Sequence, residues 1–306
     1  MSLSEIDELI KKNPLAATKQ LLLSCHPDKH PDGDKALANQ LFIKIEKLLE
    51  EQKYEHFVGK YKLGPLWRSG DVSDIYLSSD GLYYIKVGDA ALLKIEYDNL
   101  LKILKGSEGT AFIKQFPRVV EHFKVKGKAV NVFCRETDFN HISLEDVRKE
   151  KPDGLSGRHI AWIFKRLLAA LDATHRAGIV HGAILPQHFL IDKIQHVGLL
   201  VGFGQSTTVG GIITNGVSGF RAWYPPEVLN KHSVGPPTDI YMAAQLILWL
   251  ADKTDIDRKI RSFLSGCMLE KASMRPASVW ELHEEFSQLL FNLYGKPTYA
   301  KWEEGN

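Results

Sequence analysis

The stretch IVHGAILPQHFLID, residues 179–192, raises the question of whether this chain carries an active site. Two β-branched residues lead into His181, and a mostly apolar run follows that ends in Phe-Leu-Ile before an aspartate. This is the outline of a catalytic loop. The position at which such a loop carries its carboxylate holds Ala183, which has no titratable group. The rest of the chain must therefore show whether an active site accompanies the loop.

Composition places the chain among globular proteins. It has 306 residues, of which 44% are hydrophobic and 25% charged, and its formal net charge is +2. That length allows one large domain or two ordinary ones, with a substantial buried core. A nearly balanced charge does not favour nucleic acid or a membrane surface. We expect neither partner, and expect other proteins to be the partners instead.

Cysteine usage and the chain's apolar segments predict a cytoplasmic location. Cys25, Cys134 and Cys267 lie far apart and form no C-x-x-C pair, which argues against a disulfide framework or a zinc site and fits a reducing cytosol. The first residues, MSLSEIDELIKKN, are too polar for a signal peptide. The longest apolar run, residues 240–251, is too short to span a bilayer and predicts a buried helix.

Residues 1–57 have a helical pattern. Ser4 can cap a first helix, and residues 35–57 repeat apolar side chains at helical spacing. The Pro/Gly/Asp segment HPDKHPDGD, residues 26–34, interrupts the pattern. The sequence therefore predicts an antiparallel helical hairpin whose tip is His26-Pro27-Asp28.

This hairpin resembles the J domain, the co-chaperone module that stimulates the ATPase of DnaK-type chaperones. The resemblance covers roughly residues 4–57, and its signature is His-Pro-Asp between two helices. A working J domain carries several basic residues in the helix before the tip, whereas this chain has mainly Lys19 there. A QKRAA-type stretch is also absent. The resemblance implies a chaperone-binding site made of His26, Pro27, Asp28, Lys19 and Lys29. In the alternative without chaperone binding, Asp28 only holds the turn.

After residue 57 the pattern changes to strands and then back to helices. A hairpin signal, Ser79-Asp80-Gly81, lies between two apolar runs, and a second hairpin is expected at Gly127. From about residue 143 the periodicity is mostly helical. We predict an α+β fold with three parts. These are a small all-α module over 1–57, a β-rich small lobe over 58–142, and a helical large lobe with a C-terminal tail over 143–306.

Six motifs, in order, make residues 60–292 resemble a protein kinase. YYIK supplies the phosphate-binding lysine, and the next helix supplies its acidic partner. IVHGAILPQHFLI takes the place of H-R-D-L-x-x-x-N, and LLVGFGQS takes the place of the D-F-G segment. YPPEVL, PTDIYMAA and FLSGCMLEKASMRPAS complete the series. The corresponding residues are Lys86, Glu96, His181, Phe203, Glu227, Asp239 and Arg275.

The same resemblance implies which chemical groups are missing. Phosphoryl transfer needs metal ions and a group that accepts the substrate proton. The accepting aspartate falls at Ala183, the neighbouring lysine at Leu185, the asparagine metal ligand at His188 and the metal-binding aspartate at Gly202. Mg²⁺ prefers oxygen ligands, which neither imidazole nor glycine supplies as a carboxylate. We therefore expect no catalytic residue, no metal site and no required cofactor.

The loop that would cover the phosphates supports this expectation. The pattern G-x-G-x-x-G falls on residues 68–73, where only Gly70 matches a glycine. Asp71 and Asp74 would repel phosphate, by about 1 kcal/mol for a charge pair 4 Å apart in water. If ATP binds at all, we expect weak or metal-free binding that involves Lys86, Glu96, Gly70 and Arg68.

Matches to the family pattern fall on residues that hold the fold together. Glu227 would pair with Arg275, Asp239 would hold the loop backbone, and His181 and Phe203 would pack in the core. Because the departures fall on chemistry, we predict a pseudokinase that serves as an adaptor or scaffold and recruits a DnaK-type chaperone if the J-like module is active.

Two alternatives remain open at the level of sequence. In the first, the chain is an atypical ATP-dependent kinase or another nucleotidyl or phosphoryl transferase. Its acid–base groups would then come from Glu96, Asp192, His181 and His188. In the second, the main activity is stimulation of the chaperone ATPase.

Overall fold

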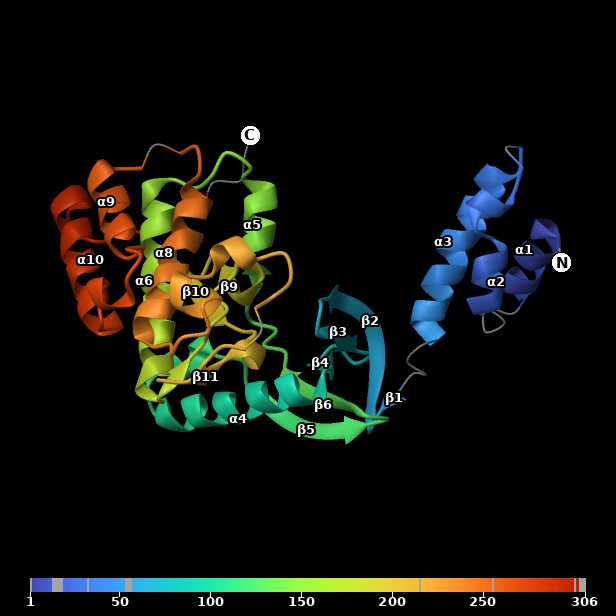
Figure 1. Cartoon of the computed structure of the whole chain (residues 1–306), viewed down its shortest axis with the longest axis horizontal. Helices are drawn as coiled ribbons and strands as arrows, with labels where there is room; N and C mark the ends of the chain where they lie inside the picture. Colours follow the sequence, from blue (N-terminus) through green and yellow to red (C-terminus); the bar gives the residue numbers. More distant parts are fainter. Residues whose placement is uncertain are drawn as a thin grey trace. The chain divides into compact units, whose positions relative to one another are not determined.

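The computed structural model describes most of the chain, namely residues 2–12, 19–31, 33–52, 57–214, 216–254, 256–299 and 301–302. For residues 12, 19 and 49–52 the description covers the backbone only. Contacts divide the chain into two units, one of Met1–Pro65 with Ser78–Asp80 and one of Leu66–Leu77 with Gly81–Asn306. Each unit is described by itself (Figure 1).

The first unit contains α1 (Leu3–Lys12), α2 (Lys19–Ser24) and α3 (Lys35–Gln52). Its core consists of apolar side chains from the three helices and the turn after α2, chiefly Ile6, Ile10, Cys25, Ala38, Leu41 and Ile45. The first helix begins earlier than expected. Ser2, not Ser4, is the cap, because Ser2 N–H donates to Glu5 Oε2 at 2.7 Å and Ser2 Oγ accepts from Glu5 N–H at 3.3 Å.

A six-stranded sheet has the order β1-β2-β3-β4-β6-β5. Its strands are β1 (Phe57–Val58), β2 (Tyr61–Ser69), β3 (Ser73–Ser78), β4 (Tyr83–Gly88), β5 (Val119–Val125) and β6 (Lys128–Cys134). The β3–β4, β4–β6 and β5–β6 pairs are antiparallel. Both expected hairpin turns use left-handed glycines, with φ of +73° at Gly81 and +81° at Gly127. Helix α4 (Ala90–Gly106) lies beside β5 and β6 (Figure 1).

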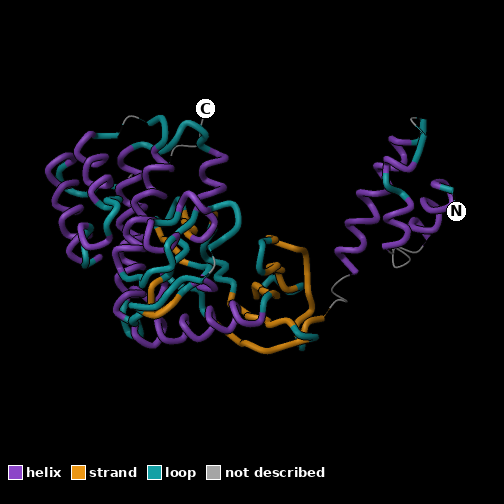
Figure 2. Tube along the Cα trace, viewed as in Figure 1, coloured by secondary structure: helices purple, strands orange, loops and turns teal. Residues whose placement is uncertain are grey.

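The remainder of the second unit is mainly helical (Figure 2). Its helices are α5 (Leu144–Glu150), α6 (Gly157–Arg176), α7 (Pro226–Leu229), α8 (Pro236–Ala251), α9 (Arg258–Gly266) and α10 (Val279–Tyr294). Helix α6 packs against α8 and α10. The apolar run 240–251 lies within α8, whose inward residues are fully buried, as expected. A β-rich segment followed by a helical segment confirms the predicted α+β order.

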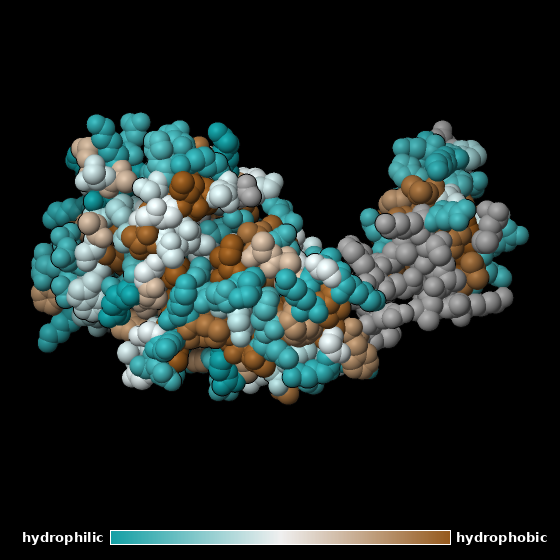
Figure 3. Space-filling model, turned by 60° about the horizontal axis from the view of Figure 1, so that its bottom comes forward, coloured by the Kyte–Doolittle hydropathy of each residue, from teal (hydrophilic) through white to brown (hydrophobic). Residues whose placement is uncertain are grey.

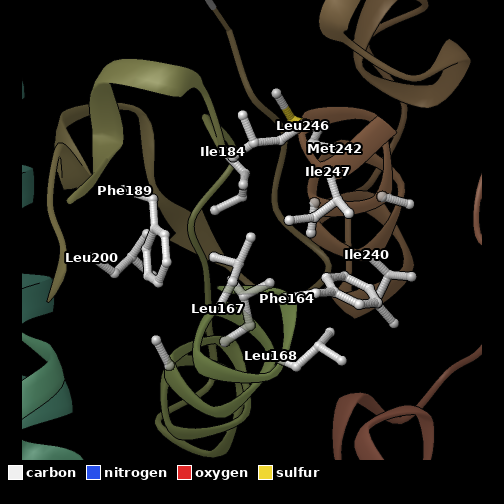
Figure 4. Close-up of a cluster of buried hydrophobic side chains, with 14 of the residues drawn as sticks. Phe164, Leu167, Leu168, Ile184, Phe189, Leu200, Ile240, Met242, Leu246 and Ile247 are labelled. Atoms are coloured by element: carbon white, nitrogen blue, oxygen red, sulfur yellow. The ribbon is translucent and has the colours of Figure 1, made fainter. Parts of the chain in front are cut away.

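Short strands hold the segment 179–192 against this helical core. β8 (Ile179–Val180) pairs with β11 (Thr207–Thr208). β9 (Phe189–Asp192) lies between β10 (Val197–Leu200) and β7 (Ile142–Ser143). Between β8 and β9, Ile184 projects toward side chains of α6 and α8 in the core (Figure 4). The loop is therefore fixed on both sides by strands and from below by two helices.

Over the described residues, no helix is both long and apolar enough to cross a membrane. On the face shown in Figure 3, small apolar patches are surrounded by hydrophilic residues.

Candidate functional site

A cleft of ≈ 650 Å³ opens in the second unit. One wall comes from the end of β2, from β3 and from β4. The other comes from residues 139–141 and Glu145 at the start of α5, from Gln187, His188 and Leu190, and from parts of the segments 199–205 and 216–220. Because the loop 179–192 supplies part of this wall, the cleft is the candidate functional site.

Lys86 and Glu96 form an ion pair in the cleft, as the sequence motifs predict. Lys86 on β4 contacts Glu96 on α4, with 2.7 Å between Nζ and Oε1. The second carboxylate oxygen accepts a hydrogen bond from Asn131 Nδ2 at 3.0 Å. Only 2% of the Glu96 side chain is exposed. The pair therefore ties the helix to the sheet, and its charges largely compensate each other.

Asp239 of α8 holds the backbone of the candidate catalytic loop. Its two carboxylate oxygens accept hydrogen bonds from the backbone N–H groups of His181 and Gly182, each at 2.8 Å. Oδ2 also accepts from His175 Nε2 at 2.8 Å. The buried carboxylate is thus satisfied by three donors, and it fixes where the loop leaves β8.

His181 is a buried histidine of the core. Its Nε2 donates to the Val201 carbonyl at 2.9 Å, and its Nδ1 accepts from Ala183 N–H at 3.2 Å. Its ring lies 4.5 Å from that of Phe203, centroid to centroid. Burial lowers the pKa of His181, so that the imidazole is neutral at pH 7. These contacts leave it no role in acid–base chemistry at the cleft.

Ala183 and Leu185 lie in the core and do not line the cleft. Both side chains are fully buried and belong to the main apolar cluster. A carboxylate or an ammonium group at either position would have to leave that cluster to reach the cleft. The two departures are therefore also packing substitutions, a consequence that the motif comparison did not reveal.

His188 and Gly202 depend on each other sterically. His188 Nδ1 donates to the Ala183 carbonyl at 2.8 Å. Gly202 has φ +83°, and a Cβ built on it would lie 2.6 Å from His188 Cδ2. The imidazole thus occupies the space that a side chain at position 202 would need. The sequence contains no signal for this contact.

Desolvation of the imidazole, together with charge repulsion from the neighbouring His181 and Lys86 as protons are added, lowers the pKa of His188 from 6.5 to about 3. Since an unfolded chain protonates this histidine near pH 6.5, stability is complete above that pH and falls as the pH drops toward 3. Between pH 7 and pH 5 we expect His188 to account for at most about 2 kcal/mol of lost unfolding free energy.

Urea unfolding at the two pH values, followed by tryptophan fluorescence, measures this loss. His188→Asn should lose less stability on acidification than the wild type, because Asn does not titrate. All other residues are the same in the two proteins, so that their contributions to the pH dependence cancel in the comparison. An equal loss in the two proteins would contradict the predicted role of His188.

Arg68 does not have the position expected of a phosphate-binding group. It reaches from β2 to the start of α5, where Nη2 contacts Asp146 and lies 3.2 Å from Ser143 Oγ. Its Nη1 lies 3.5 Å from Glu145 Oε2. Burial opposes ionisation of Asp146, but the Ser143 hydroxyl and the Arg68 charge outweigh it and lower its pKa. The arginine charge is therefore already compensated, and Arg68 bridges the two walls of the cleft.

Asp71 and Asp74 have different surroundings. Asp71 lines the cleft, and its Oδ2 accepts from Ser218 N–H at 3.1 Å. Asp74 does not line the cleft, and its Oδ1 accepts from Ser69 Oγ at 2.6 Å. Gly70 closes the β2–β3 turn through its N–H, which donates to Ser73 O at 3.0 Å. Of the two acidic residues, only Asp71 can repel an anion in the cleft.

The Arg68 bridge should limit access to the cleft. Cys134 lines the cleft and is half-buried, whereas Cys25 and Cys267 are buried. A partly exposed ion pair of this kind contributes up to about 1 kcal/mol. Arg68→Ala should therefore raise the alkylation rate of Cys134 by up to about fivefold.

Alkylation by N-ethylmaleimide, followed by peptide mass spectrometry, gives this rate. Lys149→Ala is the matched control, because Lys149 contacts the same acidic residues from within α5 and does not cross the cleft. The bridge would have no gating effect if both variants reacted at the same rate as the wild type.

Asp192 lies outside the cleft, contrary to its use as an acid–base group in the transferase alternative. Its carboxylate accepts from the backbone N–H groups of Asn140 and Ile194 at 2.8 Å and of Gln195 at 2.7 Å. Burial raises its pKa, but these three donors lower it by more. Asp192 therefore stabilises the turn after β9.

Glu227 and Arg275 form a buried, bidentate ion pair. Nη1 lies 2.7 Å from Oε1, and Nη2 lies 3.1 Å from Oε2. Phe203 packs beneath the loop, with its ring 6.1 Å from that of Phe116. The predicted architectural residues are thus brought into contact, although they come from segments far apart in the chain.

The predicted chaperone-binding residues lie in the first unit. Pro27–Lys29 form a 3₁₀ turn between α2 and α3. His26 Nδ1 accepts from Asp28 N–H at 3.3 Å, and its ring meets Phe42 edge-on at 5.4 Å. The side chain of Asp28 is 87% exposed. Lys19 begins α2, but its side chain lies outside the described part of the chain.

Sequence reasoning missed the aromatic side chains of the cleft. Tyr84 and Trp67 line it, with ring centroids 4.8 Å apart. Strand alternation could have placed Tyr84, because it lies two residues before Lys86 and so projects from the same face of β4. The contact of Trp67 with Tyr84 could not have been predicted in this way, because it depends on the pairing of separate strands.

Comparisons with known proteins bear on the fold of the second unit. Residues 104–292 match the family described as the protein kinase domain. The chain is also similar to serine/threonine-protein kinase D of Synechocystis sp., with 25% identity over 143 residues. That alignment covers 44% of this chain and 28% of the relative, so the chain spans well under half of its length. The family match begins after Lys86 and Glu96 and includes the loop 179–192.

Proposed function

The chain belongs to the protein kinase domain family, and from that premise we propose that it is a pseudokinase, a non-catalytic member that acts as an adaptor or scaffold for other proteins. We further propose that it works in the cytoplasm. The kinase-like framework supports this reading. The Lys86–Glu96 and Glu227–Arg275 ion pairs are formed, and Asp239 accepts hydrogen bonds from the loop backbone. The similarity to a serine/threonine kinase applies to the scaffold, and phosphoryl transfer is not part of the proposal.

One observation carries the proposal. The imidazole of His188 fills the space beside Gly202, so that both expected protein ligands of the metal are replaced together. Ala183 is buried and lacks the group that would accept a proton. A single lost residue can be bypassed by water or by the substrate. Loss of the base and of both metal ligands leaves phosphoryl transfer without charge neutralisation.

Phosphotransfer assays test the proposal directly. The full chain is incubated with labelled ATP and Mg²⁺ or Mn²⁺, alone and with a general acceptor protein. We expect no incorporation above that of Lys86→Ala, which lacks the lysine of the Lys86–Glu96 pair. Autophosphorylation that disappears in Lys86→Ala would overturn the proposal.

The transferase alternative has less support. Glu96 is held by Lys86 and Asn131, Asp192 caps a turn, and His181 is buried in the core. Of the four candidate acid–base groups, only His188 and Glu96 line the cleft. Thermal unfolding with millimolar ATP, with and without metal, detects binding by mass action. A raised midpoint would revive this alternative.

A second candidate function is stimulation of a DnaK-type chaperone by the first unit. The exposed turn at His26-Pro27-Asp28 favours it, because a partner can contact an exposed turn between two helices. Lys29 and Lys19 would add electrostatic attraction. In this reading the second unit is the scaffold and the first unit delivers the chaperone.

Chaperone ATPase measurements test this second candidate. The full chain should accelerate the ATPase of a DnaK-type chaperone, and His26→Gln should abolish the acceleration. His30→Gln is the matched control, because His30 lies just outside the signature and contacts the Ser24 carbonyl at 2.8 Å. No acceleration by the unmodified chain, or equal loss in both variants, would exclude it.

A further inference from the structure

The segment that follows α10 packs back onto the second unit. Helix α10 ends at Tyr294, and Gly295 after it has φ +76°, a left-handed conformation that redirects the chain. The tail segment, residues 296–299 and 301–302, then contacts the start of α6 and the turn between β9 and β10. We call the surface that it contacts the tail-binding face, and its residues are Arg158, His159, Trp162, Lys193, Ile194 and His196.

Stacked rings make the first part of this contact. The ring of Tyr299 stacks on His196 with 4.5 Å between the centroids, and His196 in turn stacks on Trp162 at 4.3 Å. The Tyr299 hydroxyl donates to the Ile194 carbonyl at 2.8 Å. The tail, the β9–β10 turn and α6 therefore contribute one ring each to a continuous stack, and such ring pairs add stabilisation beyond the apolar area they bury.

Trp302 makes a second aromatic contact. Its ring meets His159 edge-on, with centroids 4.8 Å apart, and Lys193 Nζ lies 5.6 Å from the centre of the indole. Just before the stacked tyrosine, the Thr298 hydroxyl accepts from Arg158 Nη1 at 3.0 Å. The face thus contacts one hydroxyl and two aromatic rings that are three positions apart in the sequence.

The tail-binding face is also held together by contacts in which the tail takes no part. His159 and Trp162 lie three residues apart on α6, so that they project from one side of the helix. Arg166 of the same helix donates through Nε to the His196 carbonyl at 2.9 Å and keeps the β9–β10 turn beside α6. We therefore expect the face to keep its shape when the tail moves away.

The tail itself complements this face poorly in charge. It carries Lys296 and Lys301. The face is also positive, because Arg158 and Arg166 are exposed and neither contacts a carboxylate within the described part of the chain. Tyr299 remains 61% exposed, and ordering the tail costs conformational entropy. The contact of the tail with its own chain is therefore weak enough to exchange with another segment.

From these observations we propose that the tail-binding face is a docking site for an acidic segment of a partner protein, and that the chain's own tail masks it. The partner segment carries two aromatic residues three positions apart, with a hydroxyl before the first and carboxylates in place of the tail lysines. Its rings take the places of Tyr299 and Trp302, and its carboxylates face Arg158 and Arg166. The inference goes beyond the pseudokinase proposal, because the face shares no residue with the lining of the cleft.

Two labelled peptides and one variant of the full chain test the proposal. KPTYAKW is the natural sequence of residues 296–302, and DPTYAEW replaces its two lysines by acidic residues. Tyr299→Ala combined with Trp302→Ala is the tail-release variant, because it removes both tail rings. In fluorescence anisotropy, DPTYAEW should bind this variant at least about fivefold more tightly than it binds the wild type, where the tail competes. It should also bind the variant at least about fivefold more tightly than KPTYAKW does.

Controls assign the binding to the face. Trp280→Ala should bind DPTYAEW as the wild type does, because Trp280 also stacks on a histidine, at 5.5 Å, but lies on α10 outside the face. His196→Asn, added to the tail-release variant, should weaken binding at least about fivefold, because it removes the central ring of the stack. Asparagine tolerates the φ of +52° at this position. Thermal unfolding shows whether each variant is folded.

A third peptide makes the test independent of any variant. DPTLAEL has leucine in place of both aromatic residues and keeps the charge. The wild type should bind it at least about fivefold more weakly than DPTYAEW, because leucine cannot stack on His196. If the tail-release variant does not fold, this comparison still decides the outcome.

Four results would overturn the proposal. Absence of DPTYAEW binding to the folded tail-release variant, or equal binding to this variant and the wild type, would show that the tail masks no docking site. Equal binding of DPTLAEL, or an unaltered affinity after His196→Asn, would place the peptide elsewhere. KPTYAKW binding as tightly as DPTYAEW would contradict the acidic partner. A wild type that dimerises as its concentration rises, with a monomeric tail-release variant, would assign the face to a second copy. None of these measurements uses ATP, so that failure of this inference can be distinguished from failure of the proposed function.

Discussion

Arg275→Ala should lower the unfolding free energy of the second unit by about 3–5 kcal/mol, the range for breaking a buried ion pair. The substitution leaves the Glu227 carboxylate buried with one remaining side-chain donor, the Thr238 hydroxyl at 2.9 Å. It also removes the donors to the carbonyls of Leu269 and Glu270, at 2.6 and 2.8 Å. Each unpaired buried acceptor adds a desolvation cost.

Urea unfolding followed by tryptophan fluorescence measures this loss of unfolding free energy in the second unit. All six tryptophans of the chain lie at positions 67 to 302 that belong to the second unit. Lys94→Ala is the matched control, because it breaks an ion pair with Asp98 whose side chains are 53% and 45% exposed. An exposed pair of this kind contributes about 0.5 kcal/mol or less.

Replacing both partners separates the charge effect from packing. Glu227→Leu combined with Arg275→Met should be less destabilising than Arg275→Ala, because no buried charge is left without a partner. The predicted cost of an isolated carboxylate is wrong if the double variant is as unstable as Arg275→Ala. It is also wrong if Arg275→Ala falls within the range of the Lys94 control.

Gly202→Asp, which restores the acidic residue of the D-F-G pattern, should by itself destabilise the chain by about 2–5 kcal/mol. A Cβ at position 202 would lie 2.6 Å from Cδ2 and 2.7 Å from Cγ of His188. The backbone there has φ +83°, a conformation that glycine adopts far more readily than aspartate. The imidazole cannot move away without losing its hydrogen bond to Ala183.

His188→Asn should relieve most of the steric part of this cost. In a double-mutant cycle we expect the two substitutions to interact favourably by about 1–3 kcal/mol. Gly204→Ala is the matched control, since a Cβ there would meet Leu92 Cβ at an ordinary 3.6 Å. Additive costs in the cycle, or a fully stable Gly202→Asp, would show that His188 does not fill the space at position 202.

Several parts of the fold could be predicted because their causes are local. The hairpin turns at Gly81 and Gly127 need left-handed backbone, which glycine adopts freely. The apolar run 240–251 is too rich in aliphatic residues for a surface helix, and it lies buried in α8. The capping pattern predicts the start of α1 two residues late, because both Ser2 and Ser4 can cap a helix and only Ser2 has a glutamate three residues on.

The site could be predicted in part. Motif order placed Lys86 with Glu96 and Glu227 with Arg275, and the structure shows both contacts. The prediction for Arg68 differs from the structure, because its acidic partners lie 77 and 78 residues further along the chain. No periodicity or turn signal encodes a contact over that distance.

The chemical groups that the cleft can offer follow directly from the amino-acid sequence. Ala183 and Gly202 carry no carboxylate in any fold, because the covalent sequence fixes which side chain stands at each position. The three-dimensional packing places Ala183 in the core, sets His188 in the space beside Gly202 and brings Arg68 across the cleft to α5. These facts depend on how strands and helices that are distant in the chain pack together, and packing is a property of the whole fold.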